Sequence, residues 1–259
     1  MKTGEIYLGD CLEVMNKIPD GSIDMILCDL PYQVLKADVA KWDRIIPFEP
    51  LWQQYERVIK ERGAIILFAS GMFTANLMMS NKKLWRYNLV WNKIQVSGFL
   101  NANRMPLRQH EDICVFYKKM PEYHPQMVKV GWHSRNHSKG DLSNKTHNCY
   151  GAHKNLPTVY SDEKYPTSIL TFSKNQQVNT LHPTQKPVDL LRWLIRTYTV
   201  EGEVVLDNAM GSGSTCIAAI QENRKYIGIE KDQTFYDIAQ ERINAELGIC
   251  GAFSINLFE

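Results

Sequence analysis

A short, mostly apolar run from Ile23 to Cys28 constrains the fold more than any other feature of the sequence. Such a run is typical of a buried strand in a parallel sheet. It ends in Asp29-Leu30-Pro31-Tyr32, so a carboxylate, a proline-stiffened turn and an aromatic ring follow the strand. Open α/β sheets bind ligands at the carboxyl ends of their strands. The sequence therefore predicts an α/β fold with a polar site at Asp29, suited to a planar ring that carries an exocyclic amine.

Strand and helix patterns alternate along most of the chain, which predicts a mostly parallel sheet covered by helices on both faces. Further strands are expected at 6–10, 64–68, 88–91, 112–117, 203–206 and 226–229. Apolar residues at helical spacing predict helices over 12–18, 51–62, 72–80, 188–198, 215–222 and 235–247. Between Met120 and Leu181 the periodicity fades, and a loop of this length inside a compact domain is expected to be functional or disordered.

A glycine-rich turn runs from Asp207 to Thr215 between a predicted strand and a predicted helix. Glycines let the main chain approach a ligand closely, and the helix N-terminus presents free N–H groups. Glu230 ends the next strand, where an acidic side chain can accept hydrogen bonds from both hydroxyls of a ribose. The unit predicts a nucleotide-like cofactor, although Gly211 and Gly213 could also serve a tight turn alone.

The motifs, taken together and in order, resemble the DNA amino-methyltransferases of the permuted β class, in which the catalytic motif precedes the S-adenosylmethionine motif. This resemblance implies a Rossmann-like fold, S-adenosylmethionine as cofactor and double-stranded DNA as substrate. It covers most of the chain outside 120–181. The matching pieces are Asp29–Tyr32, His182-Pro183-Thr184-Gln185-Lys186-Pro187, Gly211-Ser212-Gly213 and Tyr226–Glu230.

The resemblance implies that Asp29, Leu30, Pro31 and Tyr32 are the catalytic residues. The Asp29 carboxylate and the Leu30 carbonyl would accept the two N–H bonds of the target amine. Tyr32 would stack on a base rotated out of the duplex. Leu30 replaces the proline that is most common at this position, which keeps the carbonyl acceptor but loses one rigid ring.

The resemblance also implies the residues that bind the cofactor. Asp10 would accept a hydrogen bond from the adenine amino group, although a simple helix cap is the alternative. Lys186 and Thr184 would reach the methionine carboxylate, the alternative for Lys186 being a surface charge. Asn208 and Ala209 stand where the family usually has Pro and Phe. The complete expected set is Asp10, Cys11, Asp29, Thr184, Lys186, Asp207, Gly211, Ser212, Gly213, Ser214, Thr215 and Glu230.

Asp at position 29 favours adenine N6 as the target, because family members that methylate cytosine N4 more often carry Ser there. Cytosine N4 remains open, since both bases present an amino group to an acceptor. A DNA-binding protein without turnover is a third alternative. Methylation of cytosine C5 is unsupported, because its nucleophilic Cys follows a proline, whereas Cys28 follows Leu27.

The segment 120–181 is the candidate for target recognition. Residues 121–181 carry seven Lys or Arg against four Asp or Glu, a balance of +3. That excess suits a surface that faces phosphates, although a solvated loop can show it by chance. Its histidines and Cys149 lack the spacing of a zinc site, so no metal is expected. The expected DNA-binding residues are Trp42, Arg104, Arg108, Lys129, Arg135, Lys139 and Lys145, with core packing as the alternative for Trp42.

The bulk properties fit one large domain with an insertion: a catalytic half at 1–119, a recognition insertion at 120–181 and a cofactor-binding half at 182–259. The six cysteines show no paired spacing, the N-terminus lacks the apolar core of a signal peptide, and no apolar run approaches the ~20 residues of a membrane span. A cytoplasmic protein with no membrane contact is therefore expected. A homodimer and a cognate restriction endonuclease remain open as further partners.

Overall fold

The computed structural model describes residues 1–32, 44–130, 162–173 and 185–249. These residues form two compact units, Met1–His124 with Thr167–Glu259, and Pro125–Pro166. Five predicted site residues lie outside the described residues: Trp42, Arg135, Lys139, Lys145 and Thr184.

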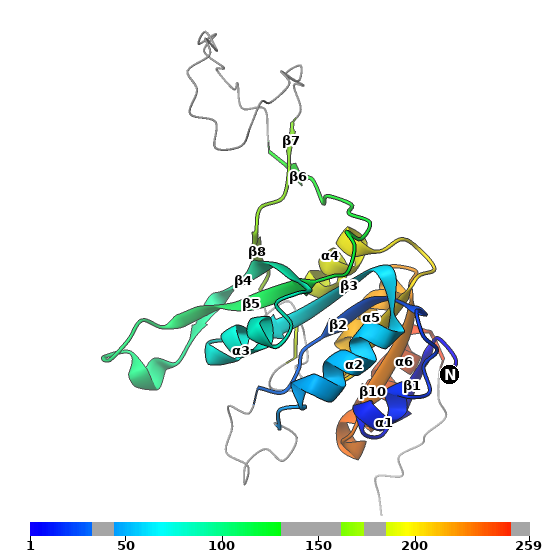
Figure 1. The fold of residues 1–259 in the computed structure, drawn as a ribbon. Helices are drawn as coiled ribbons and strands as arrows, with labels where there is room; N and C mark the ends of the chain where they lie inside the picture. The colour runs from blue at the N-terminus through cyan, green and yellow to red at the C-terminus, as the bar shows by residue number, and fades with distance from the viewer. Residues whose placement is uncertain (33–43, 131–161, 174–184, 250–259) are drawn as a thin grey trace, which may run out of the picture. The chain divides into compact units, whose positions relative to one another are not determined.

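An eight-stranded sheet organises the larger unit (Figure 1). Seven strand pairs join it, and β5 is antiparallel to both of its neighbours while the other pairs are parallel. The prediction of a mostly parallel sheet is therefore confirmed. In spatial order the strands are β1 (Glu5–Leu8), β10 (Lys225–Glu230), β9 (Val204–Asp207), β2 (Ile23–Cys28), β3 (Ile59–Ala69), β5 (Arg108–Phe116), β4 (Trp85–Ser97) and β8 (Ile169–Thr171).

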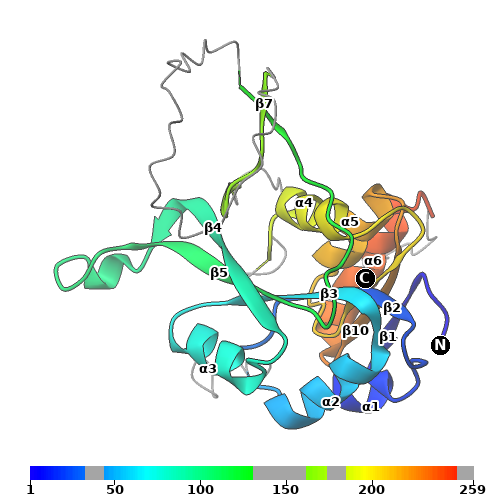
Figure 2. The same cartoon turned by 45° about the horizontal axis from the view of Figure 1, so that its top comes forward.

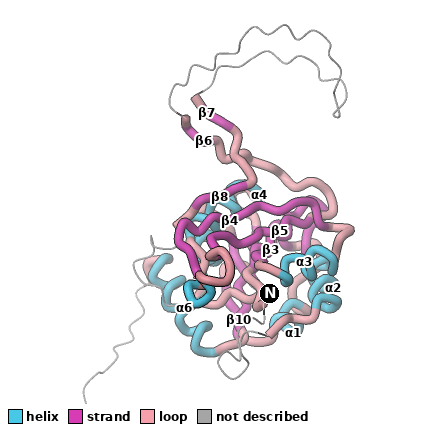
Figure 3. The backbone as a smooth tube through the Cα atoms, turned by 90° about the vertical axis from the view of Figure 1, so that its left-hand side faces the viewer, coloured by secondary structure: helices cyan, strands magenta, loops and turns pink. Residues whose placement is uncertain are grey.

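Helices cover both faces of this sheet, as the alternating pattern predicts (Figure 3). Each face has its own apolar core. On one face α1 (Cys11–Met15), α2 (Phe48–Val58) and α3 (Met72–Ser80) pack against the strands. On the other face lie α4 (Val188–Tyr198), α5 (Ser214–Gln221) and α6 (Gln233–Glu246).

The central strand β2 is buried along its whole length, because it lies between the two cores. Met25 and Leu27 belong to the core beneath α4, whereas Ile26 and Cys28 belong to the core beneath α2. The Asp24 carboxylate inside this strand accepts hydrogen bonds from the Lys60 ammonium at 2.6 Å and the Val204 N–H at 2.9 Å. Compensated in this way, a charged residue is tolerated inside a buried strand.

The helix predicted over 51–62 is too long by four residues. It ends at Val58, and β3 begins at Ile59, which pairs with Ile23 of β2. Gly63 suggests a helix end in the sequence, but the structure uses it for close packing. A Cβ atom there would lie 2.8 Å from the Asp24 carbonyl oxygen, a distance that requires glycine.

Strands β4 and β5 are longer than the sequence pattern predicts, and β8 is not predicted at all. The outer half of β4 and the start of β5 are largely exposed, so they lack the apolar alternation that identifies a strand. Both strands continue beyond the neighbouring strands to a short 3₁₀ turn, η1 (Phe99–Asn101) (Figures 1 and 2). Strand β8 has only three residues, too few for a periodic signal.

The smaller unit contains the antiparallel pair β6 (Val128–Lys129) and β7 (Glu163–Lys164). Lys129 lies exposed on β6, opposite Glu163. Among the helices that the structure describes, none has the length and apolar character needed to cross a bilayer.

Candidate active site

A cavity of about 790 Å³ opens at the carboxyl ends of β1, β2, β9 and β10. This volume is in the ordinary range for a ligand site. Arg108 also lines the cavity, whereas Gly213, Arg104 and Lys129 do not. The predicted catalytic and cofactor residues that line it are Asp10, Cys11, Asp29, Leu30, Pro31, Tyr32, Lys186, Asp207, Gly211, Ser212, Ser214, Thr215 and Glu230.

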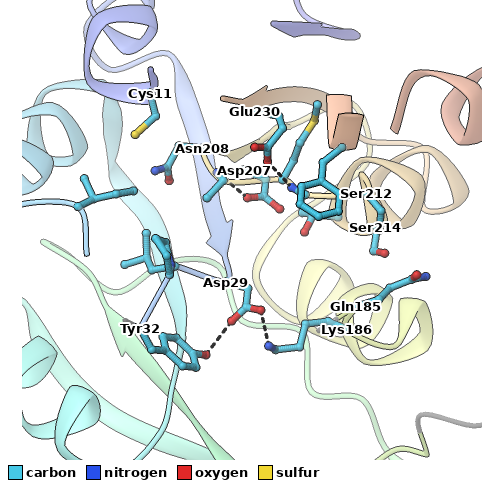
Figure 4. A pocket seen from close by; sticks show the side chains of 18 of the residues that line it. Cys11, Asp29, Tyr32, Gln185, Lys186, Asp207, Asn208, Ser212, Ser214 and Glu230 are labelled. Atoms are coloured by element: carbon cyan, nitrogen blue, oxygen red, sulfur yellow. Dashed lines mark hydrogen bonds and ion pairs between the residues drawn. The ribbon is translucent and has the colours of Figure 1, made fainter. Parts of the chain in front are cut away.

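Asp29 lies at the centre of the cavity, directly after β2, with both carboxylate oxygens engaged (Figure 4). One oxygen accepts the Tyr32 hydroxyl at 2.6 Å, and the other accepts the Lys186 ammonium. The Tyr32 ring rests on Phe73, with 4.8 Å between ring centroids. Burial together with the Asp29 charge raises the pKa of Tyr32 well above its usual value, so the phenol stays protonated and donates to Asp29.

Lys186 joins Asp29 to a second carboxylate, Glu111 on β5. The Lys186 ammonium lies 3.4 Å from one Glu111 oxygen, and the Lys93 ammonium of β4 lies 3.1 Å from the other. Burial by itself lowers the pKa of Lys186, but the charges of Asp29 and Glu111 outweigh it, and the pKa is raised. Lys93, Glu111, Lys186 and Asp29 therefore form a continuous series of ion pairs along one side of the cavity.

The glycine-rich turn is shaped for close approach. Gly211 and Gly213 have φ values of 50° and 78°, which favour glycine. A Cβ atom on Gly213 would lie 3.0 Å from Ala239 of α6, so this glycine lets the turn pack on that helix, whereas a Cβ atom on Gly211 would meet nothing within 4 Å. Gly211 therefore leaves open space on the cavity side of the turn.

Glu230 fixes this turn through its carboxylate. One oxygen accepts the Gly211 N–H at 2.9 Å, and the other accepts the N–H groups of Lys231 and Asp232, both at 2.8 Å. A carboxylate offers about four acceptor sites, so Glu230 retains acceptor capacity toward the cavity. Burial raises its pKa.

Asp207 and Arg242 are two further groups that lie at the glycine-rich turn. Asp207 is buried at the end of β9, and burial raises its pKa to about 6. Arg242 of α6 donates to the carbonyl and hydroxyl oxygens of Ser212 and to the Ser214 hydroxyl at 3.2 Å. Arg242 was not expected from the sequence, because its position in a helix pattern carries no sign of a contact 30 residues away.

Asp10 caps a helix and also lines the cavity, so its predicted contact with the cofactor adenine stays a prediction. Its carboxylate caps α1 by accepting the Leu12 N–H at 3.0 Å, and it lines the cavity, where Lys231 donates to it at 2.8 Å. The Lys231 hydrogen bond lowers the pKa of Asp10. Asn208, which departs from the family pattern, is buried and accepts the Tyr55 hydroxyl at 2.5 Å, so it ties the turn to α2.

A family model described as DNA methylase, of the N6 and N4 type, matches residues 23–241. The match includes the Asp29 turn, the Lys186 helix start and the glycine-rich turn that together line the cavity. The chain belongs to this family. It is an S-adenosylmethionine-dependent DNA amino-methyltransferase.

Two curated relatives match almost the whole DNA methyltransferase. Type II methyltransferase M.BglII of Bacillus subtilis is 27% identical over 266 residues, which cover 93% of this chain and 69% of the relative. Type II methyltransferase M.HinfI of Haemophilus influenzae is 28% identical, covering 92% of this chain and 67% of the relative.

Solved structures share the fold at low identity. The M1.HpyAVI–SAM complex has a TM-score of 0.62 and 20% identity, covering 93% of this chain and 98% of that one. PvuII DNA methyltransferase, described as cytosine-N4-specific, has a TM-score of 0.67 and 15% identity, covering 96% and 92%. At these identities the likeness establishes the Rossmann-like fold.

The cavity residues fit S-adenosylmethionine. Gly211 faces open space, Glu230 presents an acceptor suited to ribose hydroxyls, and the volume of about 790 Å³ leaves room for a base beside the cofactor. Asp207, Ser212 and Glu230 lie on one side of the cavity, whereas Asp29, Tyr32 and Lys186 lie on the other (Figure 4).

Proposed function

We propose that this enzyme methylates the N6 amino group of adenine at a specific site in double-stranded DNA. The observation that carries the proposal is the position of the Asp29 carboxylate, which lies in the cavity with Tyr32 and Lys186 fixing its two oxygens. A rigid carboxylate at this place is a preorganised acceptor for an exocyclic amine.

S-adenosylmethionine supplies an electrophilic methyl group on its sulfonium sulfur when bound. The amine nitrogen must aim a lone pair at that methyl carbon, yet in a free base this lone pair is delocalised into the ring. By accepting one N–H, Asp29 draws the nitrogen toward tetrahedral geometry and stabilises the positive charge that develops on it. The Leu30 carbonyl is proposed as the acceptor for the second N–H. After transfer the nitrogen loses one proton, and Asp29 is the nearest proposed acceptor.

The base has to leave the duplex, because an amino group inside the helix cannot reach this cavity. Tyr32 is proposed to stack on the displaced base. Its ring is held from one side by Phe73 and anchored through its hydroxyl to Asp29, so it is a rigid platform. Most of the rate enhancement is then expected from orientation of the amine for in-line transfer.

Adenine is favoured over cytosine N4 by the aspartate at position 29, which in this family is associated with adenine. The fold is shared with PvuII DNA methyltransferase, a cytosine-N4-specific enzyme, so the fold favours neither base. A protein that binds DNA without turnover has no need for an intact Asp29, Pro31 and Tyr32 beside a cofactor cavity.

The test is incubation of the purified enzyme with plasmid DNA and S-adenosylmethionine labelled on its methyl group, followed by nucleoside mass spectrometry. The proposal expects label in N6-methyladenine. Asp29→Ala should reduce transfer by ~100-fold or more, while leaving S-adenosylmethionine binding within a few-fold. Label in N4-methylcytosine would contradict the adenine assignment, and near-normal turnover in Asp29→Ala would contradict the catalytic role of the Asp29 turn.

A further inference from the structure

The β4–β5 hairpin carries an apolar tip that the described residues leave exposed. Every residue from 94 to 106 is exposed. Leu100 is 100% exposed and Phe99 67%, which is unusual for side chains of this size so close together. The large apolar residues of the tip are Ile94, Val96, Phe99, Leu100 and Met105.

The tip has a defined shape. Gly98, with a φ of 92°, starts the η1 turn, and the Asn101 N–H donates to the Gly98 carbonyl at 2.9 Å. The turn continues with the Arg104 N–H, which donates to the Asn101 carbonyl at 2.8 Å. At Ile94 the backbone has a φ of 64°, a costly value for a β-branched residue. Phe99 and Leu100 are therefore presented to solvent by an ordered turn.

The charge on the outer part of the hairpin, residues 93–110, has one sign. From Lys93 to His110 the sequence contains Lys93, Arg104 and Arg108 and no Asp or Glu. Arg104 and Arg108 are exposed. An apolar tip bordered by arginines suits a polyanion that also offers apolar surface, and the stacked bases and phosphates of DNA have both properties.

The base of the same hairpin forms a wall of the active-site cavity. Lys93, Ser97, Arg108 and His110 line the cavity that holds Asp29. A base that reaches Asp29 therefore enters a cavity that this hairpin helps to form. The exposed tip lies on the same two strands, further along the hairpin (Figure 2).

We propose that the hairpin tip is a wedge that enters DNA next to the target base, with Phe99 and Leu100 filling the space that the base leaves. Apolar side chains inserted between base steps are a known way for proteins to unstack DNA. Arg104 and Arg108 hold the adjacent phosphates. The inference rests on the proposed function, because it requires a base that leaves the duplex, and it assigns the surface that assists this step.

A second copy of this chain is a less suitable partner for the tip. In a two-fold interface the same patch meets itself, so Arg104 and Arg108 would face their own copies. The hairpin supplies no carboxylate between 93 and 110 to compensate them. DNA phosphates compensate these charges directly.

The experiment compares wild type with Phe99→Ser/Leu100→Ser on two duplexes that carry the mapped target base. In one duplex the target base is paired, and in the other the opposite nucleotide is abasic, so that the target is already unpaired. The matched control is Met72→Ser/Met79→Ser, which removes two exposed methionines of α3 that do not line the cavity. Thermal unfolding of all three proteins checks the fold, and light scattering gives their mass in solution.

The wedge predicts that the tip variant methylates the paired duplex about 10-fold or more slowly than wild type, since a tenfold change in rate needs a loss of only about 1.4 kcal/mol and unstacking a base costs a few kcal/mol. On the unpaired duplex it should come within about 3-fold, and the control should match wild type on both. Equal rates of the tip variant and wild type on the paired duplex would overturn the wedge. So would an equal loss on both duplexes with a change from dimer to monomer, which would assign the tip to an interface between copies. Whichever base is methylated serves as target, so a cytosine product contradicts the proposed function alone.

Discussion

Asp29 and Lys186 lie 157 residues apart in the sequence and form an ion pair in the cavity. The family resemblance implies both residues for the site but assigns them to different partners, Asp29 to the target amine and Lys186 to the methionine carboxylate. In the structure Lys186 contacts Asp29 and Glu111. The segments that contain Asp29 and Lys186, far apart in the sequence, are therefore joined by one buried ammonium group.

Lys186→Met should destabilise the protein, because it leaves two carboxylates in a buried place without this ammonium group. Breaking a buried pair on one side typically costs ~3–5 kcal/mol. Lys186→Met/Glu111→Gln should recover part of that loss by removing one of the two charges. Chemical denaturation gives the free energies of unfolding. Lys119→Met, which breaks an exposed pair with Glu61, is the control and should change stability by less than ~1 kcal/mol. If both lysine variants have the same stability, the pair with Asp29 contributes nothing to folding.

Glu230→Ala should weaken S-adenosylmethionine binding before it affects the methyl transfer step. The substitution removes the proposed ribose acceptor and also the tether at 2.9 Å that holds the Gly211 N–H. Loss of hydrogen bonds to a charged acceptor suggests a cost on the order of 2–3 kcal/mol, which calorimetric titration measures directly.

Glu13→Ala is the matched control for Glu230→Ala, because it removes an exposed carboxylate from the first turn of α1. Its cofactor affinity should equal that of wild type. An unchanged dissociation constant in Glu230→Ala would show that Glu230 serves only to shape the strand end.

Asp207 should make the stability of the protein depend on pH in a predictable direction. Burial raises its pKa from 3.8 to about 6, so the folded protein holds this proton more tightly than the unfolded chain does. The stability that the protonated carboxyl confers is complete below about pH 4 and is lost as the pH rises through about 6. This difference of about two in the pKa of Asp207 corresponds to about 3 kcal/mol in the free energy of unfolding.

Asp207→Asn should remove this contribution, so the difference between wild type and variant is the quantity to follow. Denaturation at intervals from pH 4 to pH 7 should show the wild type losing stability relative to the variant across that range. Parallel curves for the two proteins would mean that Asp207 has the same pKa in the folded and unfolded states.

The carboxyl ends of β1, β2, β9 and β10 could be predicted from the sequence to within about two residues, because each of these strands is a short, mostly apolar run followed by a polar or glycine-rich turn. Asp10, Asp29, Asp207 and Glu230 all follow or end such runs, and the parallel topology brings them to one cavity. At these residues the local sequence pattern already indicates the position in the fold. The order of the motifs along the chain could therefore be used to predict the site.

Glu111, Lys93 and Arg242 could not be predicted, because each depends on register or on packing between distant elements. Lys93 and Glu111 meet across an antiparallel pair whose register is irregular between Asn92 and Ser97. The predicted end of α2 is wrong for a similar reason. Gly63 does not end a helix but packs closely against the Asp24 carbonyl of a neighbouring strand. Such contacts leave no periodic trace in the sequence.

The segment 120–181 is proposed to determine DNA binding and sequence choice, on the strength of its +3 charge balance. Replacing Lys129, Arg135, Lys139 and Lys145 with Gln should weaken binding to DNA. Each lost phosphate contact should also lower the slope of log affinity against log salt concentration by roughly one unit. Fluorescence anisotropy with a labelled duplex at several salt concentrations measures both quantities.

The control for that quadruple variant replaces four exposed lysines elsewhere, Lys2, Lys17, Lys82 and Lys83, with Gln. It changes the net charge by the same amount, so any general electrostatic attraction falls equally in both proteins. The recognition proposal expects a lower salt slope in the first variant alone, with unaltered affinity for S-adenosylmethionine in both. If the two variants lose the same affinity and keep the parental slope, residues 120–181 do not contact the phosphates, and the β4–β5 hairpin with Arg104 and Arg108 becomes the principal DNA-binding surface.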